Sequence, residues 1–141
     1  MTERLDLAKA LARFYHTGQK YGQYDYFEKH LEGVANIVRG MSFDEDAEIV
    51  AYLHDILEDT PCQYGMICSL FGSKIADAVL SITKRQFETH LDYLARCKAN
   101  PLGCLVKIAD SSFNGTQCYI EGKYAKQECY FANVKFLSQK V

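Results

Sequence analysis

Ionisable side chains interrupt apolar helical runs at several points of the sequence. In the stretch AYLHDILEDT, His54 and Asp55 break an apolar run, and Glu58 and Asp59 follow four residues after them. Burying such groups costs free energy unless they are paired or bind a metal ion. On one continuous helix this spacing places each acid one turn beyond its partner. The pattern therefore predicts four acid or base groups that face one region of space.

Two further polar groups stand beside apolar segments. Asp110 ends the apolar run in GCLVKIADSSFN, which predicts a carboxylate at the buried end of a helix, with Asn114 one turn further on the same side. His30, in YFEKHLEGVA, adjoins the apolar stripe of its helix. A histidine alone at such a position is more often a satisfied, partly buried residue than a ligand. The other groups make it a candidate ligand.

Two imidazoles and two carboxylates would meet if His30, His54, Asp55 and Asp110 converge. Mixed nitrogen and oxygen donors suit Mn²⁺ or Fe²⁺, with Zn²⁺ and Ni²⁺ as alternatives, better than Ca²⁺. A single such ion acidifies bound water and polarises a phosphoryl oxygen. Glu58 and Asp59 would then orient that water or move protons. The alternative interpretation makes the whole group a solvated helix face with helix caps.

The elements that must position these residues are predicted to be helices. Apolar residues recur at helical spacing almost throughout, without sustained alternation of period two, which predicts an all-α domain of about seven to eight helices. Glycines, prolines and capping residues set the boundaries. The expected helices cover residues from Thr2 to before Gly18, 27–39, 44–57, 63–71, 73–82, 87–97 and 121–137, with a mostly buried apolar segment at 102–113 and a loop at 18–24.

Length and composition restrict the class of protein. The 141 residues, 48% hydrophobic and 24% charged, predict a single globular domain over residues 1–141 and exclude disorder. A formal net charge of −2 argues against duplex nucleic acid and acidic membranes as partners. No apolar run reaches the length of a membrane span, and the charged N-terminus lacks a signal sequence, which predicts a cytoplasmic protein whose six cysteines stay reduced.

The order of the candidate ligands resembles the motif pattern of the HD-domain metal-dependent phosphohydrolases. The residues that carry this resemblance are His30, the adjacent His54 and Asp55, and the late Asp110. Three segments are similar to the hydrolase domain of the RelA/SpoT homologues, which removes the 3′-diphosphate from (p)ppGpp. These segments are LHDILEDT, FGSKIADAVLSITK and LVKIADSSFN. HTGQK followed by YFEKHLEGVA is similar to that family's opening. The resemblance spans nearly the whole chain, so a small stand-alone hydrolase without synthetase or regulatory domains is expected, as in the metazoan SpoT homologue.

This resemblance implies roles for individual residues. It assigns metal ligation to His30, His54, Asp55 and Asp110, and the positioning and deprotonation of water to Glu58 and Asp59. It places Asn114 near the nucleotide and the opening motif, with His16 and Gln19, in the pocket wall. Lys20, Lys84, Arg85 and Lys107 are candidate phosphate contacts, and the loop tyrosines, Tyr21 and Tyr24 among them, are candidates for base stacking, loop packing or an oligomer contact.

Some positions depart from the family pattern. Tyr21 and Gly22 stand where a basic pair is usual, and Ser111 where a basic residue follows the late aspartate. Tyr26, Phe27 and Leu31 replace the proline, tyrosine and second proline around the first histidine. The metal set is untouched, so the resemblance supports metal-dependent phosphohydrolysis more strongly than it supports one substrate.

The resulting hypothesis is a manganese-dependent hydrolase of a small phosphorylated nucleotide. The best substrate candidate is (p)ppGpp, or a related 3′- or 2′-phosphorylated nucleotide such as NADPH. One alternative is an HD-type nucleotidase or deoxynucleotide triphosphohydrolase, and another is a catalytically silent nucleotide-binding module. The last helix of the chain is expected to serve core packing or dimerisation, which leaves a homo-oligomer open.

Overall fold

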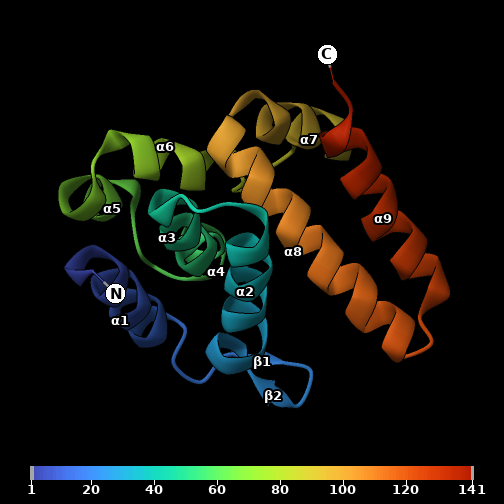
Figure 1. Ribbon diagram of the computed structural model, residues 1–141, viewed down its shortest axis with the longest axis horizontal. Helices are drawn as coiled ribbons and strands as arrows, with labels where there is room; N and C mark the ends of the chain where they lie inside the picture. Colours follow the sequence, from blue (N-terminus) through green and yellow to red (C-terminus); the bar gives the residue numbers. More distant parts are fainter. Residues whose placement is uncertain (1, 141) are drawn as a thin grey trace.

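A computed structural model describes residues 2–140, and helices account for almost all of it (Figure 1). Eight α-helices of eight or more residues lie in this part of the chain, together with the single turn α4 and a π-helical segment, η1. The predicted all-α class is confirmed. The elements are α1 (Glu3–Tyr15), β1 (Lys20–Tyr21), β2 (Tyr24–Asp25), η1 (Phe27–Leu31), α2 (Glu32–Met41), α3 (Glu45–Leu53), α4 (Ile56–Asp59), α5 (Tyr64–Phe71), α6 (Ser73–Ser81), α7 (His90–Ala99), α8 (Pro101–Ile120) and α9 (Tyr124–Ser138).

Side-chain caps define where several helices begin. The Thr2 hydroxyl accepts a hydrogen bond from the Leu5 amide, and the Asp44 carboxylate accepts one from the Asp46 amide. Thr89 caps α7 in the same way, and Asn100 caps α8 immediately before Pro101. Each cap satisfies an amide that has no partner inside its own helix. These starts follow from local sequence.

The structure differs from the predicted elements in four places. The expected loop at 18–24 contains a short antiparallel hairpin, in which Lys20 pairs with Asp25 and Tyr21 with Tyr24. The expected helix 44–57 stops at Leu53 and resumes at Ile56. The helix expected from residue 87 begins at His90, because Thr89 provides its cap. The apolar segment 102–113 is part of one helix of 20 residues, α8, so Asp110 lies inside a helix and not at its end.

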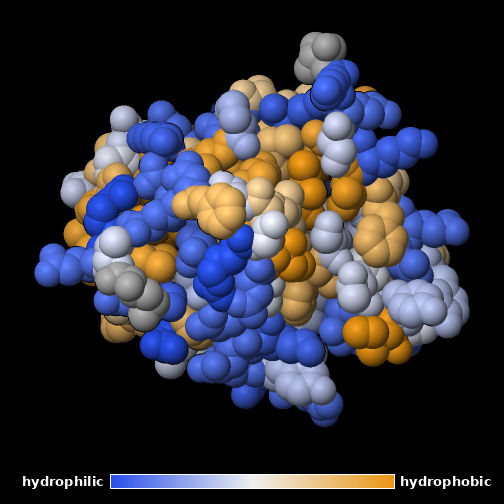
Figure 2. All heavy atoms as spheres, viewed as in Figure 1, coloured by the Kyte–Doolittle hydropathy of each residue, from blue (hydrophilic) through white to orange (hydrophobic). Residues whose placement is uncertain are grey.

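Helix α8 lies centrally and contacts most of the other long helices. It packs against α2 and α3 on one side and against α9 on the other, with α7 at its N-terminal end (Figure 1). The apolar core gathers between these helices and includes the fully buried Leu31, Tyr52 and Val106. Figure 2 shows hydrophilic side chains over much of one face, with apolar ones scattered between them.

Two predictions from composition can be compared with the described structure. The six cysteines are all free thiols, as expected. Among residues 2–140, no helix combines the length and the apolar character that a membrane crossing requires.

Gly33 sets how closely α2 approaches α8. A Cβ atom built at this position would overlap the aromatic ring of Phe113 on α8. That ring also lies against His30, with the ring centroids 5.2 Å apart. The missing side chain of Gly33 therefore lets α2, which directly continues the segment η1 with His30, lie close to the helix that carries Asp110.

We expect Gly33→Ala to lower the free energy of unfolding by about 1–3 kcal/mol, because overpacking against Phe113 outweighs the gain in helix propensity of about 1 kcal/mol. Gly65→Ala is the matched control, since Gly65 lies in α5 with open space around its Cβ position. Urea denaturation of both variants measures the difference. Equal stability of the two variants would contradict this account of the α2–α8 contact.

Candidate metal centre

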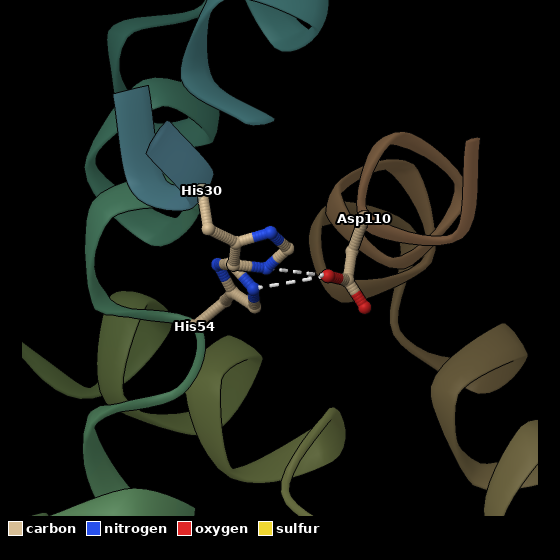
Figure 3. A group of neighbouring side chains, drawn as sticks. All are labelled: His30, His54 and Asp110. Atoms are coloured by element: carbon tan, nitrogen blue, oxygen red, sulfur yellow. Dashed lines mark ion pairs between the residues drawn. The ribbon is translucent and has the colours of Figure 1, made fainter. Parts of the chain in front are cut away.

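His30, His54 and Asp110 lie within contact of one another, although they come from three different elements (Figure 3). His30 Nε2 is 3.0 Å from Asp110 Oδ1, and His54 Nε2 is 3.3 Å from the same oxygen. All three side chains are buried. One ligand atom from each falls within 4.8 Å of the others, which is the spacing of a shared metal ion.

Asp55 lies at the edge of the same cluster. Its Oδ2 atom is 3.1 Å from His54 Nε2 and 3.7 Å from His30 Nε2. The hydroxyl of Tyr26 donates a hydrogen bond to this oxygen. The structure thus brings together all four residues that the sequence singled out as candidate ligands.

The interruption between α3 and α4 allows two adjacent residues to reach one centre. On a regular helix, neighbouring side chains point about 100° apart, so His54 and Asp55 would diverge. Helix α3 ends at Leu53, and Asp55 takes up φ −104° and ψ 2° before α4 begins. The prediction of one continuous helix over 44–57 is therefore wrong. The break lies at the two residues whose side chains must both reach the site.

The hydrogen bond of His54 determines which of its nitrogens faces the cluster. Its Nδ1 is 2.6 Å from the carbonyl oxygen of Ala51, a pure acceptor, so Nδ1 carries the proton. In the neutral ring, Nε2 then presents a lone pair to the cluster. Among the described residues, this buried atom has no hydrogen-bond partner, even though carboxylate oxygens lie close to it. Acceptor atoms that converge in this way fit a divalent cation.

The pKa shifts in the cluster also indicate that it requires a positive charge. Burial lowers the pKa of His54, but the carboxylates of Asp55 and Asp110 outweigh it and raise this pKa well above its usual range. Burial raises the pKa of Asp55, but His54 outweighs burial and lowers it to about 2. The carboxylates thus stay ionised. The donor set of imidazole nitrogens and carboxylate oxygens is the kind that Mn²⁺, Fe²⁺ and Zn²⁺ accept.

Asp110 is held from both sides along α8. Lys107 Nζ donates to Asp110 Oδ2 over 2.9 Å, and Asn114 Nδ2 lies 3.3 Å from Asp110 Oδ1. The Tyr21 hydroxyl in turn donates to Asn114 Oδ1 over 2.7 Å, and the Tyr21 ring stacks on His30. Burial lowers the pKa of Lys107, but Asp110 outweighs this and raises it well above its usual range, so the ammonium group stays charged.

Glu58 is oriented by the loop that follows α6. Its Oε1 atom accepts a hydrogen bond of 2.7 Å from the Lys84 amide. Arg96 holds that loop, because its guanidinium group donates to the Thr83 carbonyl and to Glu88. Burial raises the pKa of Glu58, the Lys84 amide opposes this, and the net direction is upward. The arrangement keeps a weakly acidic carboxyl group near the cluster.

A cavity of about 850 Å³ opens beside the cluster. Most predicted site residues lie in its wall, whereas Lys20, Lys84 and Arg85 do not. The buried His54 also lies outside the wall, and so do His16 and Gln19, which the resemblance placed in it. Lys20 is exposed on β1 next to Tyr21, and successive strand residues point to opposite sides. The predicted residues in the wall are Tyr21, Tyr24, His30, Asp55, Glu58, Asp59, Lys107, Asp110 and Asn114.

Sequence reasoning missed the part of the wall that lies far along the chain. Gln117 extends the polar stripe of Lys107, Asp110 and Asn114 at helical spacing, and that periodicity could have revealed it. Lys126 and Tyr130 reach the cavity from α9, one helical turn apart. Nothing local in the sequence distinguishes them from a packing helix. Other missed residues are Gln23, Cys118, Ile120, Glu121 and Lys123, whereas Tyr26 belongs to the loop tyrosines that the sequence singled out.

A comparison with known protein families covers the same motifs. A sequence model of the HD domain matches residues 7–100, a range that includes His30, His54 and Asp55. The chain belongs to the HD domain family. The resemblance that the sequence motifs predicted is confirmed, and Asp110 on α8 completes the cluster of this HD domain from outside the matched range.

Relatives of this HD domain include much longer proteins. The bifunctional (p)ppGpp synthase/hydrolase SpoT of Escherichia coli K12 is 35% identical over 82 residues, which cover 58% of this chain and 12% of SpoT. A guanosine-3′,5′-bis(diphosphate) 3′-pyrophosphohydrolase of Aquifex aeolicus is 28% identical over 116 residues, covering 77% of this chain and 17% of that protein. The chain therefore spans only a small fraction of the curated relatives it matches.

A solved structure shares the fold of this HD domain over nearly its whole length. The structure, described as a metazoan ortholog of SpoT that hydrolyses ppGpp, superposes with a TM-score of 0.79 at 20% identity. The match covers 97% of this chain and 84% of the other. It establishes that the helical arrangement is that of an HD domain.

We expect Mn²⁺ to stabilise the HD domain, because an ion that binds only the folded state adds about 2.7 kcal/mol at a concentration 100 times its Kd. Asp55→Ala and Asp110→Ala should lose this stabilisation. Asp77→Ala, which removes a carboxylate on α6 that accepts from Tyr64, is the control and should keep it. Thermal unfolding with and without Mn²⁺ measures the effect. A full response in Asp110→Ala would contradict the proposed ligand set.

The loop that orients Glu58 should weaken in acid. The hydrogen bond from Arg96 lowers the pKa of Glu88 from 4.5 to about 2, so its contribution to stability is complete above the higher value and is lost as pH falls toward the lower one. The stability difference between wild type and Glu88→Gln should thus be constant above about pH 6 and shrink below about pH 4.5. Urea denaturation across this range, with Glu128→Gln on α9 as control, checks it. A difference independent of pH would argue against the Arg96 contact.

Proposed function

We propose that this HD domain is a manganese-dependent phosphohydrolase whose substrate is a phosphorylated nucleotide, best represented by (p)ppGpp at its 3′-diphosphate. The observation that carries the proposal is the convergence of His30, His54, Asp55 and Asp110 at the wall of a cavity that Glu58 and Asp59 also line. The matched relatives bear the names of (p)ppGpp hydrolases, which supports the choice of substrate.

The two acids beside the cluster would handle the proton of the attacking water. A divalent ion held by the four ligands would polarise the phosphoryl group and acidify water. Glu58 and Asp59 lie three and four residues after Asp55 and face the same cavity. The oxygen of water forms a bond to phosphorus while the bond from phosphorus to the 3′ oxygen breaks. A carboxylate would take the proton of water and pass it to the 3′ oxygen, which leaves as a hydroxyl group with release of diphosphate.

Positive charge for the phosphates comes from helices α8 and α9. Lys107 lines the cavity beside Asp110, and Lys123 and Lys126 line it from the other end. These lysines offset the absence of a basic pair at Tyr21 and Gly22. Asn114 would fix the nucleotide next to the cluster, where it already bonds both Tyr21 and Asp110.

The tyrosines of the hairpin would serve two different purposes. Tyr21 stacks on His30 with ring centroids 4.9 Å apart, so it supports the ligand imidazole with one face of its ring. Tyr24 is 47% exposed at the mouth of the cavity. An exposed aromatic ring at that place is suited to stack on a nucleobase.

We also propose that the protein acts in the cytoplasm on a small nucleotide. The formal net charge of −2 gives little attraction for duplex nucleic acid or an acidic membrane. The lysines of the cavity would supply positive charge locally, next to the phosphates of a single nucleotide. A homo-oligomer is compatible with this function and is not required by it.

The proposal predicts that purified protein with Mn²⁺ releases diphosphate from ppGpp, and that Asp55→Ala abolishes this release. NADPH, nucleoside monophosphates and deoxynucleoside triphosphates complete the substrate panel. Turnover of one of these instead would keep the metal mechanism and assign another HD-type nucleotidase activity. Nucleotide binding without any turnover would identify a silent binding module.

Glu58→Gln is the matched variant that separates proton transfer from metal binding in the same assay. It should retain Mn²⁺ and slow kcat about a hundredfold or more, because it removes a proton acceptor without altering the ligands. Metal loss in this variant, or unchanged kcat, would contradict the assigned role of Glu58.

A further inference from the structure

His16 is a buried imidazole that the proposed chemistry does not use. It is the C-cap of α1 and is 2% exposed. The segment after α1 leads into the hairpin of β1 and β2, whose residues line one side of the cavity (Figure 1). Within residues 2–140 its Nε2 has no hydrogen-bond partner, whereas its Nδ1 lies 2.6 Å from Gln19 Oε1. A buried polar ring with one strong contact calls for a physical reason.

The backbone holds Gln19 in place on both sides. The Gln19 amide donates to the His16 carbonyl over 2.9 Å, and the Gln19 carbonyl accepts from the Tyr26 amide over 3.0 Å. Gly18 permits the turn between them, because it takes up φ +82°. The side chain of Gln19 therefore leaves a fixed point of the backbone.

The acceptor at the far end of Gln19 decides the direction of the hydrogen bonds. Gln19 Nε2 lies 3.0 Å from Asp59 Oδ2. An ionised carboxylate only accepts hydrogen bonds, so the amide nitrogen must face Asp59 and the amide oxygen must face His16. His16 Nδ1 is then the donor, and Nε2 is the ring atom without a partner among the described residues. The chain of donors runs from His16 through Gln19 to Asp59.

Stacking fixes the plane of the His16 ring. Its centroid lies 5.1 Å from that of Tyr26, with an angle of 27° between the planes. Tyr26 is itself anchored, because its hydroxyl donates to Asp55. The ring that aims Gln19 at Asp59 is thus tied to a candidate metal ligand, so the two carboxylates have a common support.

We propose that His16 and Gln19 are positioning residues that orient the carboxylate of Asp59 toward the attacking water. The inference rests on the proposed function of Asp59 as a proton acceptor. Asp59 is exposed on the single turn α4, where a carboxylate would otherwise rotate freely. A donor on Oδ2 fixes the plane of the group and leaves the other oxygen to take the proton. Orientation of a catalytic group affects kcat and leaves substrate affinity unchanged.

Two substitutions of His16 separate hydrogen bonding from packing. His16→Asn keeps a nitrogen donor near the position of Nδ1 but removes the ring, whereas His16→Phe keeps a ring against Tyr26 but removes the donor. At saturating Mn²⁺ we expect His16→Phe to lose about tenfold in kcat with KM unchanged, and His16→Asn to stay within about threefold of wild type. Equal losses in both variants, or full kcat in His16→Phe, would overturn the proposal.

Gln19→Met tests the second link with a side chain of similar size. It should lose about tenfold in kcat, with Mn²⁺ affinity unchanged, and adding His16→Phe should cause no further loss because both remove the same chain. Gln63→Met, at the exposed residue before α5, is the matched control and should keep wild-type kcat. Additive losses in the double variant would overturn the coupling between His16 and Gln19.

A measurement without substrate keeps the inference separate from the proposed activity. Two-bond ¹H–¹⁵N correlations of the Zn²⁺-loaded protein identify the His16 tautomer, which we expect to be Nδ1–H in wild type and to lose that preference in Gln19→Met. An Nε2–H tautomer in wild type would overturn the hydrogen-bond chain whatever the activity. Absence of turnover on every nucleotide, with the expected tautomer, would instead count against the proposed function.

Discussion

The structure depends on a cluster of acceptor atoms that would repel one another without a positive charge between them. Asp110 and the lone pair of His54 meet as buried groups, and the largely buried Asp55 adjoins them at the cavity wall. Burying such groups is costly, and Lys107 offsets the charge of Asp110 in part, while a metal ion or a proton would offset the rest. The core around them is arranged accordingly. Gly33 lets α2 approach α8, and the break after Leu53 turns two neighbouring side chains toward one point.

Helix α8 has a dual role in this arrangement. Its apolar side, with Val106 and Ala109, belongs to the core, while its polar stripe of Lys107, Asp110 and Asn114 forms one wall of the cavity. One rigid helix therefore sets the distance between a ligand, the lysine that pairs with it and the amide that would hold the nucleotide. The continuity of α8 past the apolar run makes this possible.

Most of the fold and the four candidate ligands could be predicted from sequence, and the reasons for the failures are physical. Helix starts follow from local caps such as Thr2, Asp44 and Thr89. The break at His54 and Asp55 could not be predicted, because their apolar surroundings read as one continuous helix. The contribution of Lys126 and Tyr130 depends on how α9 folds back along α8, which is tertiary information. The prediction that Lys20 lies at the site was wrong for a local reason, because β1 turns its side chain away from the cavity.

The fold-back of α9 on α8 divides the site into two parts with different constraints. The candidate ligands and acids line the cavity from η1, the α3–α4 region and α8, whereas α9 and the turn before it contribute a separate part of the wall, here called the rim. Residues of the rim can change without disturbing the buried charge balance behind them. Substitutions on the last helix alone can therefore change which ligand the cavity prefers. The metal ligands and the catalytic acids remain the same.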